Sequence, residues 1–431
     1  MEMLNRNRRD VLKGAAAVAA ASLAPTVWTS VSAAAVDRKA GAIAIDKVLS
    51  DAVQEKQVPG IVGIAANGSG VIYEGAFGKR NVETGPTMTL DTVFLVASMT
   101  KAVTGVAAMQ LVEQGKLTLD DPIEKVLPAL ASPQVLEGFD EQGNPKLRPA
   151  KGKITLRQLL THTSGFTYDF LNANTGRYVK FKNLPDVITG KNLALTTPLA
   201  FDPGTDWEYG ISSDLAGKAV EAASGENLDV YFRKHIFEPL GMKSTGFLIG
   251  DQENRLATVH GRKEDGSFSP LNVRFSQEPE FFGGGGGLYG TASDYLVFLQ
   301  MLMHGGAFNG ATILKSSTIE QMSKNNMGDV KVRAMKTQAP ALTADIDFGK
   351  LFPGQDIKWG LSFMINPKQG PAGRSANSLS WAGIANTYFW LDPSKKVAGV
   401  LLSQTLPFAD PVSLGIYDRF ERGVYKLTSE T

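Results

Sequence analysis

The sequence predicts a mixed α/β fold: an antiparallel sheet flanked by helices and built from both chain termini, with an all-α domain inserted between them. Strand-like runs stand near both ends of the chain, whereas short helical patterns and loops dominate the middle. This distribution indicates that the two ends meet in one sheet. The strand-like runs are Ile61–Ala66, Val71–Gly78, Gly360–Ile365, Asn386–Leu391 and Val397–Gln404.

The elements of the first half follow from local pattern. Residues from Ala40 to Lys56 have the apolar spacing of an amphipathic helix. The first two strand-like runs are separated by Asn67-Gly68-Ser69-Gly70, which is typical of a hairpin turn. A helix that contains Ser98 comes next and ends near Gly115. Further helical patterns follow at 154–160, 214–224 and 228–237.

The second half begins with a glycine run, Gly283 to Gly287, and a helical pattern at 292–302. Residues 328–357 lack periodicity and are expected to be an irregular insertion. Trp381 lies near the start of a strand-like segment, Ser380 to Leu391, and a terminal helix is expected at 411–424. We therefore expect an α/β domain made of residues 36–115 and 285–431, a mainly helical domain at 116–284, and an active site between them.

Residues 1–35 have the features of a Tat-type export signal. Arg8 and Arg9 precede a small-residue apolar run from Gly14 to Ala24, and Ala33-Ala34-Ala35 offers a cleavage site. The run is shorter than the roughly 20 residues that span a bilayer. We therefore expect a periplasmic or secreted protein with no stable membrane anchor after the signal is removed.

The composition argues against several kinds of partner and site. The formal net charge is +1 without a long basic run, so no nucleic acid is expected as a partner. The absence of cysteine from all 431 residues rules out thiol catalysis and zinc–thiolate sites. The four histidines are far apart in the sequence, and no metal site is expected.

Ser98 and Lys101 are the first candidates for catalysis. They lie three positions apart, so on a helix their side chains share one face and can touch. A serine hydroxyl becomes a good nucleophile when a base takes its proton. A lysine whose pKa is lowered by burial can be that base. Because Ser-x-x-Lys also arises by chance, its weight depends on the rest of the chain.

Tyr209 and the segment Trp381-Ala382-Gly383-Ile384 are further candidates. Tyr209 follows a Pro-Gly turn and precedes a helical pattern, so its phenol can point into a cleft. A nearby lysine ammonium would lower the pKa of this phenol and let it relay a proton. The small residues of the second segment let a substrate carbonyl approach backbone N–H groups. Taken alone, Tyr209 fits a packing residue better, and Gly383 fits an ordinary strand.

Two other features have simpler explanations than catalysis. His162 ends a helical pattern shortly before Gly165, so a helix terminus accounts for it. The glycines at 283–287 lack the spacing of a phosphate-binding loop and are expected to form a flexible loop.

Taken together, the order of these motifs resembles the serine β-lactamase and penicillin-binding-protein superfamily. The nearest likeness is to class C β-lactamases and family VIII carboxylesterases, and it covers nearly all of the mature chain. It implies the β-lactamase/transpeptidase-like fold. The segments that carry it are Ser98–Lys101, Ile154–Gly165, Phe237–Met242, Gly283–Tyr295, Trp381–Gly383 and Tyr388–Pro393.

The resemblance also implies roles for the candidate residues. Ser98 would be the acylated nucleophile, Lys101 its base, and Tyr209 the second base and proton relay. The backbone N–H groups of Ser98 and Ile384 would form the oxyanion hole. The reaction would be a two-step acyl transfer that needs no metal and no organic cofactor.

Two departures from the β-lactamase pattern point to esters. Tyr209-Gly210-Ile211 stands where β-lactamases have Tyr-x-Asn, and Ile211 cannot hydrogen-bond a β-lactam amide. Trp381-Ala382-Gly383 replaces Lys-Thr-Gly. Losing such a lysine removes its contact with a substrate carboxylate, which contributes about 1.5–3 kcal/mol to the free energy of binding. Trp381 and Trp207 would suit an uncharged apolar group. We therefore expect a carboxylesterase for small to medium apolar esters, with substrate contacts from Trp381, Ala382, Gly383, Ile211 and Trp207.

Three alternatives remain open at this point. The same machinery could serve a β-lactamase or a D-amino-acid or oligoamide peptidase, or an acyltransferase that passes the acyl group to an alcohol. A non-catalytic module that binds wall material is a third, although Ser98, Lys101 and Tyr209 together argue against it. The natural ester and the oligomeric state stay open, and the segment 166–190 fits a lid over the cleft or an exposed loop.

Overall fold

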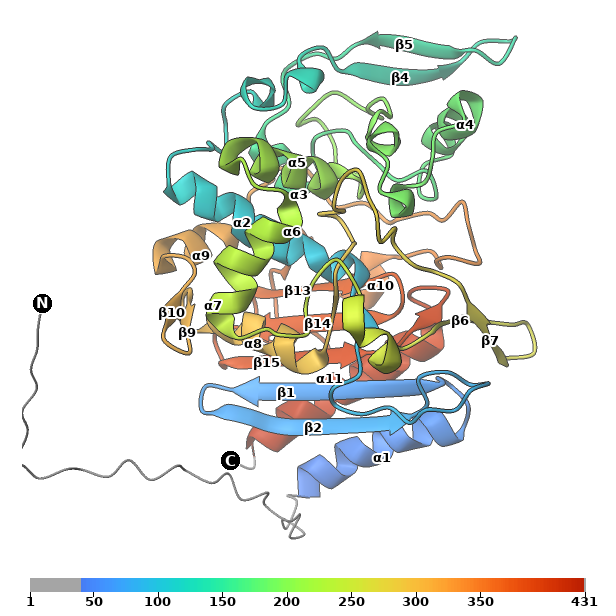
Figure 1. The fold of residues 1–431 in the computed structure, drawn as a ribbon, viewed down its shortest axis with the longest axis vertical. Coiled ribbons are helices and arrows are strands. Elements are labelled where there is room, and N and C mark those ends of the chain that lie inside the picture. The colour runs from blue at the N-terminus through green and yellow to red at the C-terminus, as the bar shows by residue number, and fades with distance from the viewer. Residues whose placement is uncertain (1–39, 430–431) are drawn as a thin grey trace, which may run out of the picture. The chain divides into compact units, whose positions relative to one another are not determined.

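A seven-stranded antiparallel sheet lies at the centre of the protein (Figure 1), whose structure is a computed structural model that describes residues 40–429. Its strand order is β11-β12-β13-β14-β15-β1-β2. Strands from the beginning and the end of the chain are neighbours, because β1 pairs with β15. The predicted sheet from both termini is confirmed. The strands are β1 (Gly60–Asn67), β2 (Gly70–Gly78), β11 (Lys358–Trp359), β12 (Met364–Asn366), β13 (Ser378–Gly383), β14 (Thr387–Asp392) and β15 (Val397–Leu402).

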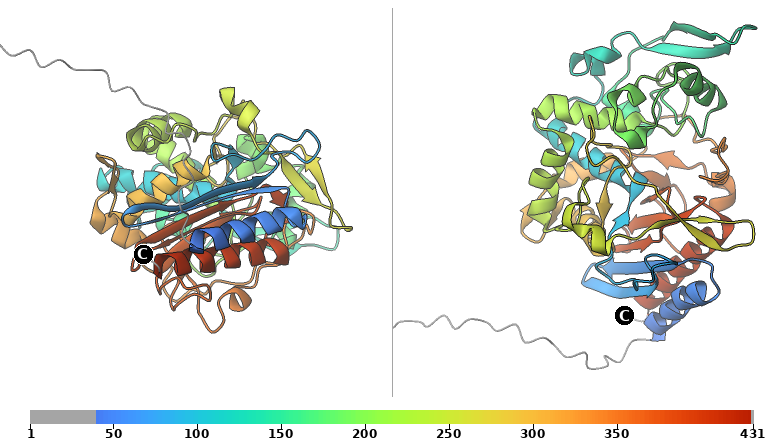
Figure 2. Two further views of the ribbon diagram at one scale, coloured as in Figure 1. Left: turned by 90° about the horizontal axis from the view of Figure 1, so that it is seen from below. Right: turned by 45° about the vertical axis from the view of Figure 1, so that its right-hand side comes forward.

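Helices cover both faces of this sheet. The helices α1 (Ala40–Gln54) and α11 (Pro411–Ser429) lie side by side on one face (Figure 2). On the other face pack α8 (Ala292–Met303) and the core around α2 (Thr100–Glu113). Within β1, Ile61 belongs to the core under α1 and Val62 to the core under α2. Since successive side chains of a strand point to opposite faces, a fully apolar β1 fits a sheet buried on both sides.

Between α2 and α8 the chain forms mainly short helices, as predicted. They are α3 (Leu156–Thr161), α4 (Ala173–Lys182), α5 (Ser212–Ser224), α6 (Leu228–Phe232), which continues as a π-helical turn, and α7 (Glu238–Leu240). The region also contains two hairpins that the sequence pattern does not predict. Prolines at both ends of β5 hide one of them, because proline cannot donate to a strand ladder. The hairpins are β4 (Gln134–Phe139) with β5 (Pro145–Pro149), and β6 (Val259–Arg262) with β7 (Phe268–Leu271).

The remaining elements are short. The insertion 328–357 is irregular, as predicted, except for one helical turn, α10 (Phe348–Leu351). The others are β3 (Phe94–Leu95), β8 (Tyr289–Gly290), β9 (Ala307–Phe308), β10 (Ala311–Thr312), β16 (Thr405–Leu406) and α9 (Ser316–Met322).

Two predicted strand boundaries are wrong. The segment from Ser380 to Leu391 is two strands, and Ile384 to Asn386 is the turn between them. Asn386 takes a φ of 56°, a left-handed conformation that asparagine tolerates and that reverses the chain. The run 360–365 is mostly the turn between β11 and β12, where Ser362 has a φ of 75°. The expected export signal lies outside the described residues. Among residues 40–429, no helix has the length and apolar character needed to cross a bilayer.

Candidate active site

Ser98 lies in a short 3-10 turn, Ala97–Met99, that leads into α2. Ala97 has a φ of 47°, which is uncommon for a residue with a side chain. Thr100 stabilises this turn: its hydroxyl donates to the Ala97 carbonyl at 2.6 Å and accepts the Leu288 N–H at 3.1 Å. Strained backbone held by surrounding contacts is frequent at active sites.

Lys101 is hydrogen-bonded to Ser98 and can serve as its base. Its Nζ lies 3.1 Å from Ser98 Oγ, and it also donates to the Gly285 carbonyl at 2.6 Å. The side chain is 1 % exposed. Burial lowers the pKa of Lys101 to about 7, since the charged ammonium loses its water, while the negative charge of Asp214 acts in the opposite direction. A substantial fraction of Lys101 is therefore neutral near pH 7 and able to accept the Ser98 proton.

Tyr209 lies between Ser98 and Trp381. Its hydroxyl accepts a hydrogen bond of 2.9 Å from Trp381 Nε1 and is also hydrogen-bonded to the Ser98 side chain. Burial raises the pKa of Tyr209 well above its usual value. The expected fall in this pKa is therefore wrong, because desolvation of the phenolate outweighs the hydrogen bonds with Ser98 and Trp381 that would lower it. Tyr209 stays protonated near neutral pH and can donate its proton.

Two further residues act on Lys101, one through a hydrogen bond and one through its charge. The Tyr168 hydroxyl accepts a hydrogen bond of 3.1 Å from Lys101 Nζ. Asp214 is 3 % exposed and accepts the Gly285 N–H at 2.8 Å, and burial raises its pKa. Tyr168 follows no recognisable motif. Asp214 resembles an ordinary acidic residue in the first turn of a helix, so neither residue carries a signal in the sequence.

The glycine run 283–287 is a packed part of the site and not the flexible loop expected from its composition. All five glycines are buried. A Cβ on Gly285 would lie 2.4 Å from Asp214 Oδ2, and one on Gly284 would lie 2.8 Å from the Ser213 carbonyl. The absence of side chains lets this segment approach α5 and accept the Lys101 hydrogen bond.

The end of β13 lies against the Ser98 turn. A Cβ on Gly383 would be 2.3 Å from the Val96 carbonyl, and the Thr387 hydroxyl donates to that same carbonyl at 3.2 Å. Ser98 and Ile384 both line one cavity. The two residues expected to form the oxyanion hole therefore line the same cavity. Ser98 comes from the 3-10 turn before α2, and Ile384 comes from the turn after β13.

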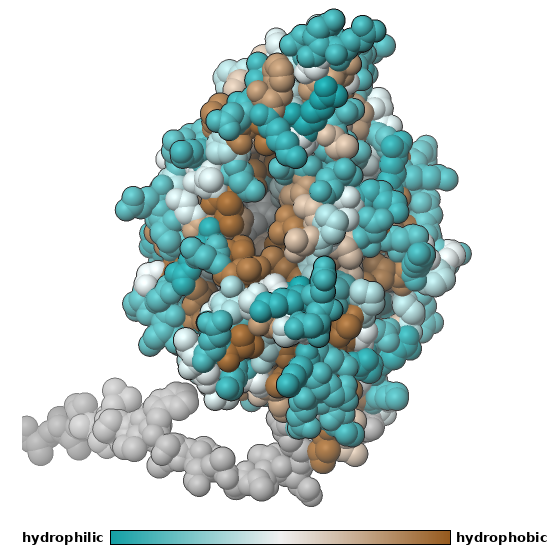
Figure 3. All heavy atoms as spheres, turned by 90° about the vertical axis from the view of Figure 1, so that its right-hand side faces the viewer, coloured by the Kyte–Doolittle hydropathy of each residue, from teal (hydrophilic) through white to brown (hydrophobic). Residues whose placement is uncertain are grey.

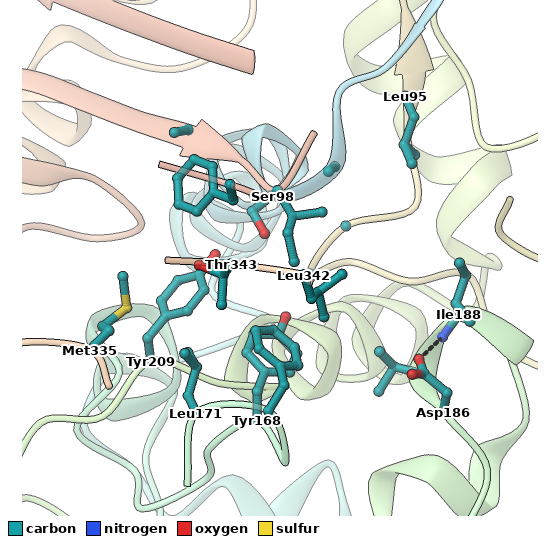
Figure 4. Close-up of a pocket in the computed structure, with 18 of the residues that line it drawn as sticks. Leu95, Ser98, Tyr168, Leu171, Asp186, Ile188, Tyr209, Met335, Leu342 and Thr343 are labelled. Carbon is teal, nitrogen blue, oxygen red and sulfur yellow. Dashed lines mark hydrogen bonds between the residues drawn. The ribbon is translucent and has the colours of Figure 1, made fainter. Parts of the chain in front are cut away.

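This cavity has a volume of about 160 Å³ and is mostly apolar (Figure 4). Figure 3 shows a hollow with hydrophobic residues around it on the face that lies to the right in Figure 1. The insertion 328–357 and the segment 166–190 both contribute to the wall. Of the described residues that line it, the charged ones are Asp186 and Asp214, and none is Lys or Arg. The lining includes Tyr168, Phe170, Val187, Met335, Leu342, Trp381 and Ala382.

Some expected site residues lie behind the cavity wall. Trp207 and Ile211 are buried and do not line the cavity, and Gly383 reaches it only through its neighbours Ala382 and Ile384. His162 has a left-handed φ of 60° at the end of α3, as a helix terminus requires. Its ring packs 4.6 Å from the Tyr209 ring, and burial lowers its pKa. His162 therefore packs against Tyr209, and Trp207 packs in turn against the His162 ring. Among residues 40–429, no cluster of three or more His, Asp or Glu side chains could hold a metal ion.

Comparison with known proteins identifies the family. The Beta-lactamase family model matches residues 45–422, and the twin-arginine signal model matches residues 7–25, which supports export. Monacolin J acid methylbutanoyltransferase from Aspergillus terreus is 31% identical over 398 residues, covering 89% of this chain and 95% of that protein. Lovastatin esterase from Penicillium rubens is 28% identical, with coverages of 89% and 98%. A mutant of simvastatin synthase from Aspergillus terreus superposes with a TM-score of 0.78 at 29% identity, with coverages of 93% and 100%. The chain therefore belongs to the β-lactamase family of serine enzymes.

Proposed function

We propose that this protein is an exported serine carboxylesterase that acts on uncharged, apolar esters through an acyl-enzyme. The observation that carries the proposal is the position of Lys101, buried 3.1 Å from Ser98 at an apolar cavity. A base with a pKa near the working pH is what general-base activation of a serine requires.

In the acylation step, Ser98 Oγ attacks the ester carbonyl carbon and Lys101 Nζ takes its proton. The carbonyl oxygen becomes an oxyanion, which the backbone N–H groups of Ser98 and Ile384 would stabilise. The carbon–oxygen bond to the alcohol then breaks, and the Tyr209 hydroxyl protonates the leaving alkoxide. Lys101 returns a proton to Tyr209, so the alcohol leaves neutral and the acyl group stays on Ser98.

In the deacylation step, water attacks the acyl carbonyl in the place that the alcohol has left. Tyr209 takes the proton of the water while giving its own proton to Lys101, in the reverse of the first relay, and Lys101 then supplies the proton for Ser98. The bond to Ser98 Oγ breaks, Ser98 regains its proton and the carboxylic acid is released. The first half-reaction is thus repeated in reverse with water in place of the alcohol.

The chemistry of the cavity favours an ester over a β-lactam or a peptide ending in a carboxylate. Such substrates carry a negative charge, and the described cavity lining holds no Lys or Arg to pair with it. Asp186 and Asp214 would repel it. Trp381 presents an aromatic surface in place of a cation, which suits an uncharged group.

Transfer of the acyl group to an alcohol is a second candidate. An apolar wall binds an alcohol with an apolar body better than water, and a methylbutanoyltransferase is among the relatives. Both reactions share the acyl-enzyme and differ in what attacks it. The two are separated by adding an alcohol such as butanol to the ester assay and measuring new ester against free acid. If the ratio of new ester to free acid greatly exceeds the molar ratio of butanol to water, the protein is a transferase.

The decisive experiment compares wild type, Ser98→Ala and Ser69→Ala on p-nitrophenyl butyrate and a chromogenic cephalosporin. Ser69 is exposed in the β1–β2 turn and is a matched control. We expect ester turnover by wild type and Ser69→Ala, and a loss of about 10³-fold or more in Ser98→Ala. Faster turnover of the cephalosporin would assign a β-lactamase instead. Equal rates in wild type and Ser98→Ala would refute the nucleophile.

A further inference from the structure

A second apolar cavity, with a volume of about 130 Å³, lies next to the cavity at Ser98. It is found between β13, the first turns of α11 and the end of the insertion that contains α10. Its size is close to that of the first cavity, about 160 Å³. Residues that line only this second cavity include Phe348, Leu351, Met364, Ala372, Leu414 and Tyr417.

One wall is common to the two cavities. Ile346, Trp381, Ala382 and Phe408 line both of them. The irregular insertion holds this wall in place, because the Phe408 N–H donates to the Leu342 carbonyl at 3.0 Å and the Phe408 carbonyl accepts the Ala344 N–H at 2.8 Å. Trp381 also bonds to Tyr209, so the wall is continuous with the groups around Ser98.

We propose that the second cavity is a subsite for the far end of an extended hydrocarbon chain of the ester substrate. The chain starts at the ester bond beside Ser98, passes the side chains of Ile346 and Phe408, and ends between β13 and α11. This inference rests on the proposed esterase function and names its substrate class, which is long-chain rather than short-chain esters.

The charges around the second cavity favour an uncharged occupant. Arg374 is 3 % exposed, and its Nε donates to Glu421 at 2.8 Å while its Nη2 donates to the Tyr417 hydroxyl at 2.8 Å. Asp418 is paired with Arg422. Charges that already have partners gain little from a charged ligand, which would itself lose its water. The remaining lining is alkyl and aromatic, so a hydrocarbon chain fits it.

The two cavities are separate, so a chain would pass the shared wall by displacing its side chains. Phe408 is half-buried and stacks on Tyr388 at 6.1 Å, whereas Ile346 is almost wholly buried. Neither side chain carries a polar group that would lose a hydrogen bond when it rotates. A substrate too short to reach this wall would occupy the Ser98 cavity alone.

The test compares chain-length profiles of wild type with those of variants that fill the second cavity. Ala372→Phe adds bulk from the turn before β13, and Leu414→Trp adds bulk from α11. If one of these variants fails to fold, the other still tests the proposal. Ala131→Phe, at an exposed alanine, is the matched control. One series uses p-nitrophenyl acetate, butyrate, octanoate and dodecanoate, and the other uses acetate esters of ethanol, butanol, octanol and dodecanol. The first varies the acyl chain, and the second varies the alcohol.

In wild type, kcat/KM should rise by about fourfold for each methylene that enters the second cavity. Within each series, we compare kcat/KM for the longest ester with kcat/KM for the shortest. Filling the cavity should lower this ratio by about tenfold or more, since the loss of two buried methylenes already accounts for a tenfold change. Ile346→Ala removes bulk from the wall between the two cavities and should raise this ratio of kcat/KM values. The series that responds identifies whether the acyl chain or the alcohol chain enters the subsite. Profiles that are identical in wild type, Ala372→Phe and Leu414→Trp in both series would overturn the proposal.

A binding measurement separates this proposal from the esterase function. Dodecanol should raise the Tm of the Ser98→Ala variant, and adding Ala372→Phe to that chain should abolish the rise while Ala131→Phe retains it. This result supports the subsite even where no ester is turned over. An equal Tm rise in all three chains contradicts the subsite even where esters are hydrolysed.

Discussion

The indole Nε1 of Trp381 donates a hydrogen bond of 2.9 Å to the hydroxyl of Tyr209. Trp381 belongs to β13 and Tyr209 to the segment before α5, so this bond joins two elements that meet at Ser98. The same tryptophan lines both apolar cavities. One residue therefore orients the proposed proton donor and shapes the space for the substrate.

Removing this bond should slow catalysis. Trp381→Phe keeps an aromatic ring but leaves the Tyr209 hydroxyl without its donor, and we expect kcat for p-nitrophenyl butyrate to fall by about tenfold. The matched control is Trp390→Phe, because Trp390 is fully buried and its Nε1 has no hydrogen-bond partner among the described residues. An equal loss of kcat in the two variants would show that ring volume, and not the bond, is what matters.

The pH dependence should report the pKa of Lys101. Its pKa is about 7, and the protonated form cannot accept the Ser98 proton. We expect kcat/KM to fall by about tenfold per pH unit below pH 7 and to level off above it. A pH–rate profile of wild type with a neutral ester checks this. A flat profile from pH 5 to pH 8 would exclude Lys101 as the titrating base. The variant Lys101→Met, which lacks the base, serves as the inactive reference.

Asp214→Asn should move the same acidic limb to lower pH. The negative charge of Asp214 raises the pKa of Lys101, so removing the charge lets burial lower this pKa further. The amide keeps an oxygen that can accept the Gly285 N–H. Asp186→Asn is the control, because its carboxylate bonds the Ile188 N–H at 2.9 Å and is not a source of the Lys101 shift. A limb that moves to higher pH, or equally in both variants, would contradict the coupling.

Gly285→Ala should destabilise the protein and the site together. The new Cβ would lie 2.4 Å from Asp214 Oδ2, and overpacking of this kind costs about 1–3 kcal/mol in the free energy of unfolding. Urea unfolding and kcat should both respond, because the Gly285 carbonyl accepts from Lys101. Gly246→Ala is the control, since a Cβ there has its nearest neighbour at 4.0 Å. A stability equal to that of wild type would show that the glycine run relaxes freely.

Much of the fold could be predicted from local pattern. The helix α1, the β1–β2 hairpin and the helix after Ser98 follow from periodicity and turn residues, which act between near neighbours. The run Asn386–Leu391 anticipates β14, but the end of β13 did not follow from local pattern, because the turn depends on the left-handed Asn386. Its side chain donates to the Thr405 and Pro407 carbonyls, contacts that exist only after folding.

The residue types of the candidate site are already visible in the chain: a serine and a lysine one helical turn apart, a tyrosine, and an isoleucine and a tryptophan where β-lactamases have asparagine and lysine. The protonation of these groups and the shape of their cavity depend on folding. Burial sets the direction of the pKa shifts of Lys101 and Tyr209, and burial depends on residues far apart in the chain. Tyr168 and Gly285 bond Lys101 from two separate segments and the charge of Asp214 acts on it from a third, and an interaction between distant segments leaves no periodic trace in either one.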